Sequence, residues 1–193
     1  MSVTDQEIIR RILSGDDRAF ALLIERHKDR AMTLAVRMLK DRREAEEALQ
    51  DAFVRAFRAL PGFQLKSSFS TWFYRIVFNV CSSMLSRKGD ERLLSIERDD
   101  DNETGIELAS TDDTPDIRLE HEEFRSIVKT EIDKMDQEYS AVLTLFYIQD
   151  MSYEEIVEVT GLPIGTVKNR LFRARNVLRD AVRKHLEVNH EAA

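Results

Sequence analysis

The 193-residue chain has little cysteine, proline or glycine and no long apolar run. Its single cysteine, Cys81, excludes an internal disulfide and a zinc site built from several cysteines. Three prolines and six glycines leave few breaks for regular structure. No stretch of about 18 apolar residues is present, so we expect no membrane insertion. The N-terminus is charged too early to resemble a secretory signal, and we therefore expect a cytoplasmic protein.

Acidic and basic residues are segregated along the chain, although its overall net charge is −7. Residues 1–89 carry a net charge of +5, and residues 90–116 carry −9. Residues 168–184 hold seven basic side chains against Asp180 alone. The average acidity therefore hides two basic surfaces, which favours a nucleic-acid partner for both ends of the chain.

Apolar residues recur at three- and four-residue steps through residues 1–88, which predicts a bundle of helices. The expected helices are Gln6 to Leu13, Asp17 to about Lys40, Glu44 to Leu60, and one that begins after Ser67 or Ser68 and runs to about Arg87. The third has the clearest apolar stripe, which consists of Ala45, Ala48, Leu49, Ala52, Phe53, Ala56, Phe57 and Leu60. Pro61-Gly62 should end it.

Residues 89–116 are acidic, poor in aromatic residues and without sustained periodicity. They predict either a solvated flexible linker or an acidic strand that docks in a basic channel. A second helical domain is expected over residues 117–187, with a helix from Ile117 to about Met135 and another from Gln137 to about Gln149, followed by a tail over 188–193. The predicted fold is all-α, with two small helical domains joined by an acidic flexible linker.

A helix-turn-helix is predicted inside the second domain. Ser152 and Glu155 have the spacing of a capping box, Gly161 supplies a tight turn, and Pro163 restarts a helix. In that helix Val167, Leu171, Ala174, Leu178 and Ala181 should pack inward. The residues expected to face outward are Gly165, Thr166, Asn169, Arg170 and Arg173, and such a face can enter a major groove. The alternative is an ordinary solvated basic face.

Aromatic residues cluster between Phe63 and Phe78, interleaved with cations. Trp72, Phe73 and Tyr74 are consecutive, so at least one should be exposed or shared with a loop. Exposed rings beside cations can stack unpaired bases. We favour this role for Phe63 and Asn79, whereas simple core packing is the better interpretation of Phe69, Phe73 and Ile76.

Several motifs resemble the extracytoplasmic-function sigma factors, group 4 of the sigma-70 family, and in particular the sigma-E type. The motifs are Glu44-Ala45-Glu46-Glu47-Ala48-Leu49-Gln50-Asp51-Ala52-Phe53, Phe69-Ser70-Thr71-Trp72-Phe73-Tyr74-Arg75-Ile76, Ser152-Tyr153-Glu154-Glu155-Ile156, and Gly165-Thr166-Val167-Lys168-Asn169-Arg170-Leu171-Phe172-Arg173-Ala174-Arg175. They recur in the family's order and cover nearly the whole chain apart from the linker and tails.

The resemblance implies a transcription initiation factor, not an enzyme, with no cofactor, metal or small-molecule substrate. Residues 1–88 would be region 2 and residues 117–187 region 4. Glu47, Gln50 and Asp51 would contact the clamp helices of core RNA polymerase. The residues implied in recognising and opening the minus-ten element are Arg55, Ala59, Phe63, Trp72, Arg75 and Asn79. Those implied at the minus-thirty-five element are Thr166, Lys168, Asn169, Arg170, Phe172 and Arg173.

The resemblance also implies further partners. Region 4 would touch the polymerase flap, the acidic tether would thread the polymerase cleft, and an anti-sigma factor would hold the chain inactive, in some cases at the membrane. One departure concerns the minus-ten loop, where Gln64-Leu65-Lys66 replaces a pattern that commonly contains glycine. Leucine takes a positive φ less cheaply than glycine does, which puts the loop path in question.

Two other classes of protein remain to be distinguished. A two-domain repressor or response-type regulator could use the same helix-turn-helix but would leave the aromatic cluster unexplained. A small nuclease would need an acidic metal cluster, yet the carboxylates concentrate in the tether.

Overall fold

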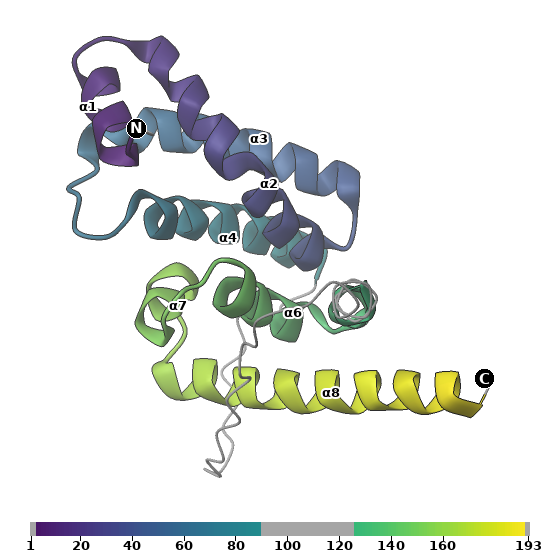
Figure 1. Ribbon diagram of the computed structural model, residues 1–193. Coiled ribbons are helices and arrows are strands. Elements are labelled where there is room, and N and C mark those ends of the chain that lie inside the picture. The colour runs from purple at the N-terminus through teal and green to yellow at the C-terminus, as the bar shows by residue number, and fades with distance from the viewer. Residues whose placement is uncertain (1–2, 90–125, 192–193) are drawn as a thin grey trace.

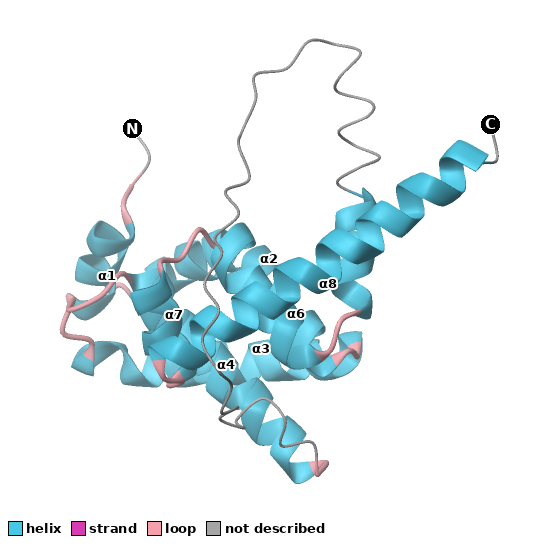
Figure 2. Ribbon diagram, turned by 90° about the horizontal axis from the view of Figure 1, so that it is seen from below, coloured by secondary structure: helices cyan, strands magenta, loops and turns pink. Residues whose placement is uncertain are grey.

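The computed structural model describes residues 3–89 and 126–191, with side chains up to residue 184. Every regular element in these ranges is a helix or helical turn (Figure 2). The N-terminal bundle (residues 3–89) contains α1 (Asp5–Leu13), η1 (Asp17–Ala19), α2 (Phe20–Leu39), α3 (Arg42–Ala59), η2 (Leu60–Gly62) and α4 (Phe69–Arg87). The C-terminal bundle (residues 126–191) contains a helix over 126–134, α6 (Gln137–Leu143), η4 (Thr144–Ile148), α7 (Tyr153–Thr160) and α8 (Ile164–Glu191).

Side-chain caps set where the helices of the N-terminal bundle begin. Thr4 and Glu7 form a capping box at α1, and the Asp41 carboxylate accepts the Glu44 backbone N–H at the start of α3. Ser68 does the same for Thr71 at the start of α4, which confirms one of the two predicted cap positions. The predicted helices are therefore present, and none of their ends is shifted by more than three residues.

Phenylalanine rings fill the centre of the N-terminal bundle. Phe73 of α4 stacks on Phe53 of α3 at 4.6 Å between ring centroids and on Phe69 at 5.8 Å. Phe20 of α2 meets Phe53 edge-on at 6.4 Å. Phe53, Phe69 and Phe73 are at most 7% exposed, so three helices share one aromatic core.

The second helix of the C-terminal bundle differs from its prediction. The helix expected from Gln137 to about Gln149 changes from α6 to the π-helical turn η4 at Thr144. Val142 and Leu145 are buried, whereas Phe146 is only partly buried. The expected start at Ile117 lies outside the described residues.

The two bundles pack directly against each other, an arrangement that the sequence left open. Helix α4 lies against α7, and α2 lies against α6 and η4 (Figure 1). Buried apolar residues of both bundles join into one continuous cluster. Helix α8 packs on α6 and α7 and lies on the side away from α4 (Figure 1).

Asp5 ties α1 to α2. One of its carboxylate oxygens lies 2.9 Å from Nε2 of the buried His27, and the other accepts from Arg26. Burial works to raise the pKa of Asp5, but the hydrogen bonds and charges of His27 and Arg26 outweigh burial and hold that pKa below its ordinary value.

We expect Asp5→Asn to lower the free energy of unfolding by about 1–2 kcal/mol at pH 7, because it removes charge-assisted hydrogen bonds. The pKa of Asp5 is lowered in the folded state, so its stabilisation is present above the ordinary value of 3.8 and is lost as the pH falls through the folded value. Urea unfolding of the wild-type protein and Asp5→Asn should therefore show a difference in the free energy of unfolding that becomes smaller below about pH 4. Asp29→Asn, at an exposed carboxylate of α2, is the control and should change little; an equal loss there would contradict the assignment.

Candidate nucleic-acid interface

The loop between α3 and α4 presents an aromatic pair. Pro61 and Gly62 end α3 in the turn η2, and Phe63 follows with an extended backbone. The Phe63 ring lies 4.8 Å from that of Trp72 at an interplanar angle of 33°. Both rings are partly buried against the core. The prediction that one of the three consecutive aromatic residues is shared with a loop is confirmed by Trp72, while Phe73 and Tyr74 are buried.

The outward face of α4 continues from this pair. Arg75 and Asn79 are exposed and one helical turn apart, next to the partly exposed Trp72. Phe63 is partly exposed and Asn79 is exposed, so neither residue is sealed in the core. This face therefore combines stacking, positive charge and hydrogen bonding, as single-stranded nucleic acid requires.

The outward face of α3 carries charge at one end and apolar side chains at the other. Glu47 and Gln50 are exposed, and Asp51 is partly exposed. Arg55 donates to Asp51 at 3.0 Å, which brings together two residues predicted to bind different partners. Ala59 is exposed at the end of the helix.

Sequence reasoning missed two apolar residues on the outward face of α3. Val54 is 47% exposed, and Phe57 is 38% exposed although it was predicted to point inward. Phe57 touches only the edge of the core, where its ring lies 5.0 Å from that of Phe20. Phe57 lies one helical turn after both the buried Phe53 and the exposed Val54. The helical period alone therefore does not decide whether Phe57 faces the core or the solvent.

The helix-turn-helix forms as predicted. The Ser152 hydroxyl accepts the Glu155 backbone N–H at 3.2 Å, and the Glu155 carboxylate accepts the Ser152 N–H at 3.0 Å. Gly161 ends α7 with a φ of 72°, a conformation that glycine adopts without a Cβ clash. After Pro163, α8 begins at Ile164.

In the first turns of α8, fewer side chains are exposed than the sequence predicted. Lys168 is exposed, and Asn169, Phe172 and Arg173 are partly exposed. The predictions that Thr166 and Arg170 face outward are wrong, because they are 6% and 1% exposed. Arg170 lies three residues after Val167 and four before Ala174, on the inward stripe, where it meets Glu138 of α6 at 3.3 Å. The buried arginine therefore fixes α8 on α6.

Arg175 lies beside the reading face and packs on aromatic rings. Its guanidinium carbon is 5.0 Å from the Phe146 ring centroid and 5.6 Å from that of Tyr147. Such cation–π contacts hold a charged side chain against a helix surface. The π-helical turn η4 supplies both rings, so it supports α8 from the side.

Two family models match this chain, one on each bundle. "Sigma-70 region 2" matches residues 23–91, and "Sigma-70, region 4" matches residues 125–178. The chain is 33% identical to the RNA polymerase sigma-H factor of Pseudomonas aeruginosa over 92% of its own length and 93% of that protein. It is also 33% identical to the ECF RNA polymerase sigma-E factor of Escherichia coli, over 93% of this chain and 95% of that protein. The chain belongs to the extracytoplasmic-function sigma factors.

Solved structures of similar fold agree with this family. A complex of CnrH with the cytosolic domain of CnrY matches with a TM-score of 0.61 and 26% identity, over 93% of this chain and 97% of that one. The sigma factor RpoE of Bartonella quintana, in complex with the anti-sigma factor NepR, matches in fold with a TM-score of 0.60 at 20% identity, over 85% and 96% of the two chains. The all-helical fold predicted from the sequence is therefore confirmed.

Neither a metal-binding group nor a membrane-spanning helix is present in the described part of this sigma factor. Residues 3–89 and 126–191 contain no group of three or more histidine, cysteine or acidic side chains placed to hold a metal ion. No helix among them is both long and apolar enough to cross a bilayer.

The loop between α3 and α4 has a left-handed turn without glycine. Leu65 has a φ of 56° and is 49% exposed. A side chain in this conformation places its Cβ close to the backbone, at a cost of roughly 1–2 kcal/mol. The loop path that the sequence put in question therefore exists, with a strained residue at its turn.

Leu65→Gly should raise the free energy of unfolding by about 0.5–1 kcal/mol, since glycine relieves the strain but gains entropy in the unfolded chain. Chemical denaturation of the intact sigma factor would measure the change. Lys66→Gly, at the neighbouring exposed residue without a positive φ, should instead lower stability. A loss of stability in both variants would show that Leu65 is not strained.

Alanine substitution of Arg170 should mainly lower stability, whereas alanine substitution of Arg173 should mainly affect DNA recognition. Arg170→Ala leaves Glu138 buried without its charge partner and should cost about 3–5 kcal/mol of stability. Arg173→Ala, at a partly exposed position, should lower the melting temperature much less than Arg170→Ala does, and it should reduce discrimination at one base pair of the upstream element by about 1–3 kcal/mol. Thermal unfolding and competition binding against single-base-pair variants of the promoter separate the two effects. Equal melting temperatures for both variants would contradict the buried role of Arg170.

Proposed function

We propose that this sigma factor binds core RNA polymerase through α3, reads the minus-thirty-five element with α8, and opens the minus-ten element with the α3–α4 loop and α4. One observation carries the proposal: a single chain presents a surface of rings, a cation and an amide suited to separated strands, and a basic helix-turn-helix suited to duplex DNA. We assign residues 1–88 to region 2, 89–116 to the acidic linker and 117–187 to region 4.

Strand opening requires a pocket that offsets the loss of stacking in the duplex. Extruding a base costs a few kcal/mol, and a stacked ring returns roughly 1–3 kcal/mol per base. Phe63, supported by Trp72, offers the ring, and the exposed Asn79 amide offers hydrogen bonds to a base edge. Arg75, also exposed on α4, can neutralise a phosphate of the same strand. Arg55 can do so only by sharing its guanidinium with Asp51.

We assign recognition of the minus-thirty-five duplex to fewer residues of α8 than the sequence predicted. Asn169 can pair with adenine and Arg173 with guanine, and Phe172 can make apolar contact with a thymine methyl. Lys168 is exposed and suited to a phosphate. Thr166 and Arg170 act through the packing of α8 and not at the DNA surface.

Attachment to polymerase is proposed for the outward face of α3. Glu47 and Gln50 are exposed there, and Asp51 lies beside them. Region 4 would contact the flap. The acidic linker, which we propose threads the polymerase cleft, falls mostly outside the described residues.

Regulation by an anti-sigma factor is part of the proposal. It is supported by the fold shared with an RpoE that was solved together with the anti-sigma factor NepR. Such a partner would act in the cytoplasm, where it could also hold the chain at the membrane. The chain itself is proposed to act on polymerase and not as a catalyst.

The experiment that tests the function adds the purified chain to core RNA polymerase and maps transcript starts on genomic DNA. Starts that depend on the chain and share two spaced elements support the proposal. Duplex binding without such starts would indicate a repressor instead, and metal-dependent DNA cleavage would indicate a nuclease.

In the same assay Asn79→Ala should slow promoter opening about 10-fold or more, because one base-edge hydrogen bond is lost in the open complex. Potassium permanganate reactivity of unpaired thymines measures opening, and native gel shift measures attachment to core polymerase. Attachment should stay at the wild-type level. Ser83→Ala, one turn further along the exposed side of α4, is the control. Failure of attachment in Asn79→Ala would assign Asn79 to polymerase binding.

A further inference from the structure

A cleft of about 450 Å³, here called the α1–loop cleft, lies between α1 and the loop that joins α3 to α4. Its volume falls within the range of roughly 300–1,000 Å³ that is usual for sites holding small organic groups. The residues that matter for its chemistry are Gln6 and Ile9 of α1, Arg26 of α2, Leu65 and Ser67 of the loop, and Phe69 of α4. The cleft shares no lining residue with the outward face formed by Phe63, Trp72, Arg75 and Asn79.

Phe69 connects the α1–loop cleft to the aromatic pair. Its ring centroid lies 6.3 Å from that of Phe63 and 5.7 Å from that of Trp72, and the residue is 4% exposed. Because Phe69 also lines the cleft, one buried ring separates the cleft from the proposed stacking site. A strand that stacks one base on Phe63 can therefore reach the cleft with another.

The charges in the cleft favour a neutral base over a phosphate. Arg26 donates to the Asp5 carboxylate, which also lies 2.9 Å from Nε2 of His27, so the positive charge of Arg26 is already balanced. The hydroxyls of Thr4 and Ser68 accept backbone N–H groups at the starts of α1 and α4, which occupies donors that an anion would use. A phosphate would thus gain little here.

Two polar side chains of the cleft remain available for the edge of a base. Within residues 3–89 and 126–191, the Gln6 amide and the Ser67 hydroxyl make no hydrogen bond to another residue. Each of these groups can both donate and accept. Ile9 and Phe69 add apolar walls beside them. Apolar walls next to free polar groups match a base, which has a flat apolar face and a polar edge.

Leu65 supplies a further wall in a strained conformation. It lines the cleft with a φ of 56° and is 49% exposed, so its side chain adds little to the core. Strained backbone is concentrated at ligand sites, where the surrounding structure holds it in place. An apolar side chain kept at such a position points to a ligand that covers it.

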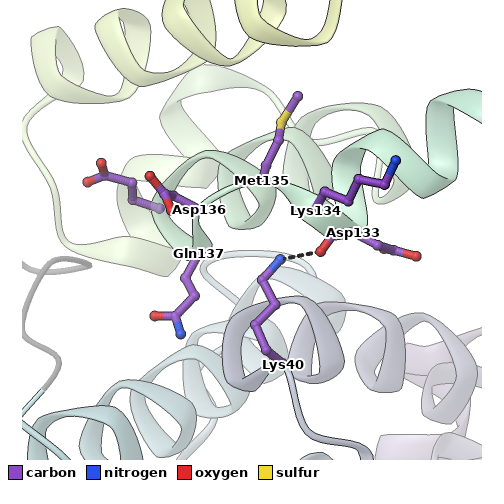
Figure 3. Close-up of a pocket in the computed structure, with 7 residues that line it drawn as sticks. Lys40, Asp133, Lys134, Met135, Asp136 and Gln137 are labelled. Atoms are coloured by element: carbon purple, nitrogen blue, oxygen red, sulfur yellow. Dashed lines mark hydrogen bonds between the residues drawn. The ribbon is translucent and has the colours of Figure 1, made fainter. Parts of the chain in front are cut away.

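The other cleft of the described residues has a different character. It measures about 290 Å³ and lies between the two bundles, where Lys40 Nζ donates to the Asp133 carbonyl oxygen at 2.8 Å (Figure 3). Asp133, Asp136 and Glu138 all line it, and these acidic residues would repel DNA. Gln137 of this cleft is therefore a suitable control position for Gln6 (Figure 3).

We propose that the α1–loop cleft binds a second unpaired base of the strand whose first base stacks on Phe63. Leu65 and Phe69 would cover the face of this base, and Gln6 and Ser67 would hydrogen-bond to its edge. The inference rests on the proposed function, because an unpaired strand must be present. It adds a second base-reading site to that function.

The α1 wall makes this site a feature of the present chain and not of the matched domain alone. Gln6 and Ile9 precede residue 23, where the match to "Sigma-70 region 2" begins. Leu65 stands in a loop whose pattern commonly contains glycine. The preference for the second base is accordingly set by side chains of α1 together with Leu65.

The test uses the full chain bound to core polymerase, on promoter DNA whose minus-ten region is held open by mismatches. One base at a time is replaced with an abasic site in either strand, and competitor challenge measures the lifetime of each complex. The wild-type complex should be sensitive at two positions of one strand. Its lifetime should fall about fivefold or more at each, because a missing base forfeits its stacking.

Removing the polar groups of the cleft should affect the second position only. Gln6→Ala combined with Ser67→Ala should shorten the lifetime on intact DNA about threefold or more, and an abasic site at the second position should then have a smaller further effect. The first position should stay sensitive in this double variant and become less sensitive in Asn79→Ala. Gln137→Ala is the matched control and should keep both sensitivities.

Leu65→Gly separates binding at the cleft from stability of the fold. Glycine relieves the strain but removes the wall, so this variant should unfold at a higher denaturant concentration and still lose sensitivity at the second position. Misfolding would lower stability and so cannot produce this combination. Unchanged sensitivity at the second position in both Leu65→Gly and the double variant would overturn the proposal.

The remaining outcomes distinguish the cleft from the proposed function. If Asn79→Ala abolishes one sensitive position but no position depends on Gln6 and Ser67, the cleft proposal fails and the proposed function stands. If the double variant attaches poorly to core polymerase without DNA, the cleft binds protein, which also overturns the proposal. If no initiation depends on the chain, both proposals fail.

Discussion

The 3.6-residue period of the α-helix is the constraint on which both DNA-reading surfaces depend. A helix that packs on its neighbours with one side leaves only the remaining positions for a ligand. In α4 the buried Phe69, Phe73 and Val77 leave Arg75 and Asn79 to solvent. In α8 the buried Val167, Leu171 and Ala174 leave Lys168, Asn169 and Arg173 at the surface. Packing therefore determines which side chains can touch DNA.

The same period explains what could and could not be predicted from the sequence. The caps at Ser68 and Ser152 and the glycine turn at Gly161 were predictable, because each is a local rule with a residue signature. Arg170 was misplaced because its charge was given more weight than its position beside Val167 and Ala174. Phe57 was misplaced for the converse reason, since an apolar residue at the edge of a stripe was counted as core.

Contacts between distant segments were beyond the reach of sequence reasoning. Arg37 and Asp133 carry no spacing signal that relates them, and Glu155 was recognised only as a capping residue although it also binds Thr71. A local motif uses one lone pair of a carboxylate and leaves others for tertiary partners. Glu155 thus links the two bundles through a shared use of its carboxylate, which no single-sequence pattern records.

Leu65 has a consequence for how promoter preference can diversify. The loop between α3 and α4 is fixed at its ends by the turn at Pro61 and the cap at Ser68, and it holds a left-handed turn even with an unfavourable residue there. The backbone path is thus largely independent of the side chains between these two anchors. Under the proposed function, residues 64–67 can consequently be exchanged to give new base preferences, while Phe63 keeps its contact with Trp72 and the helices on either side stay the same.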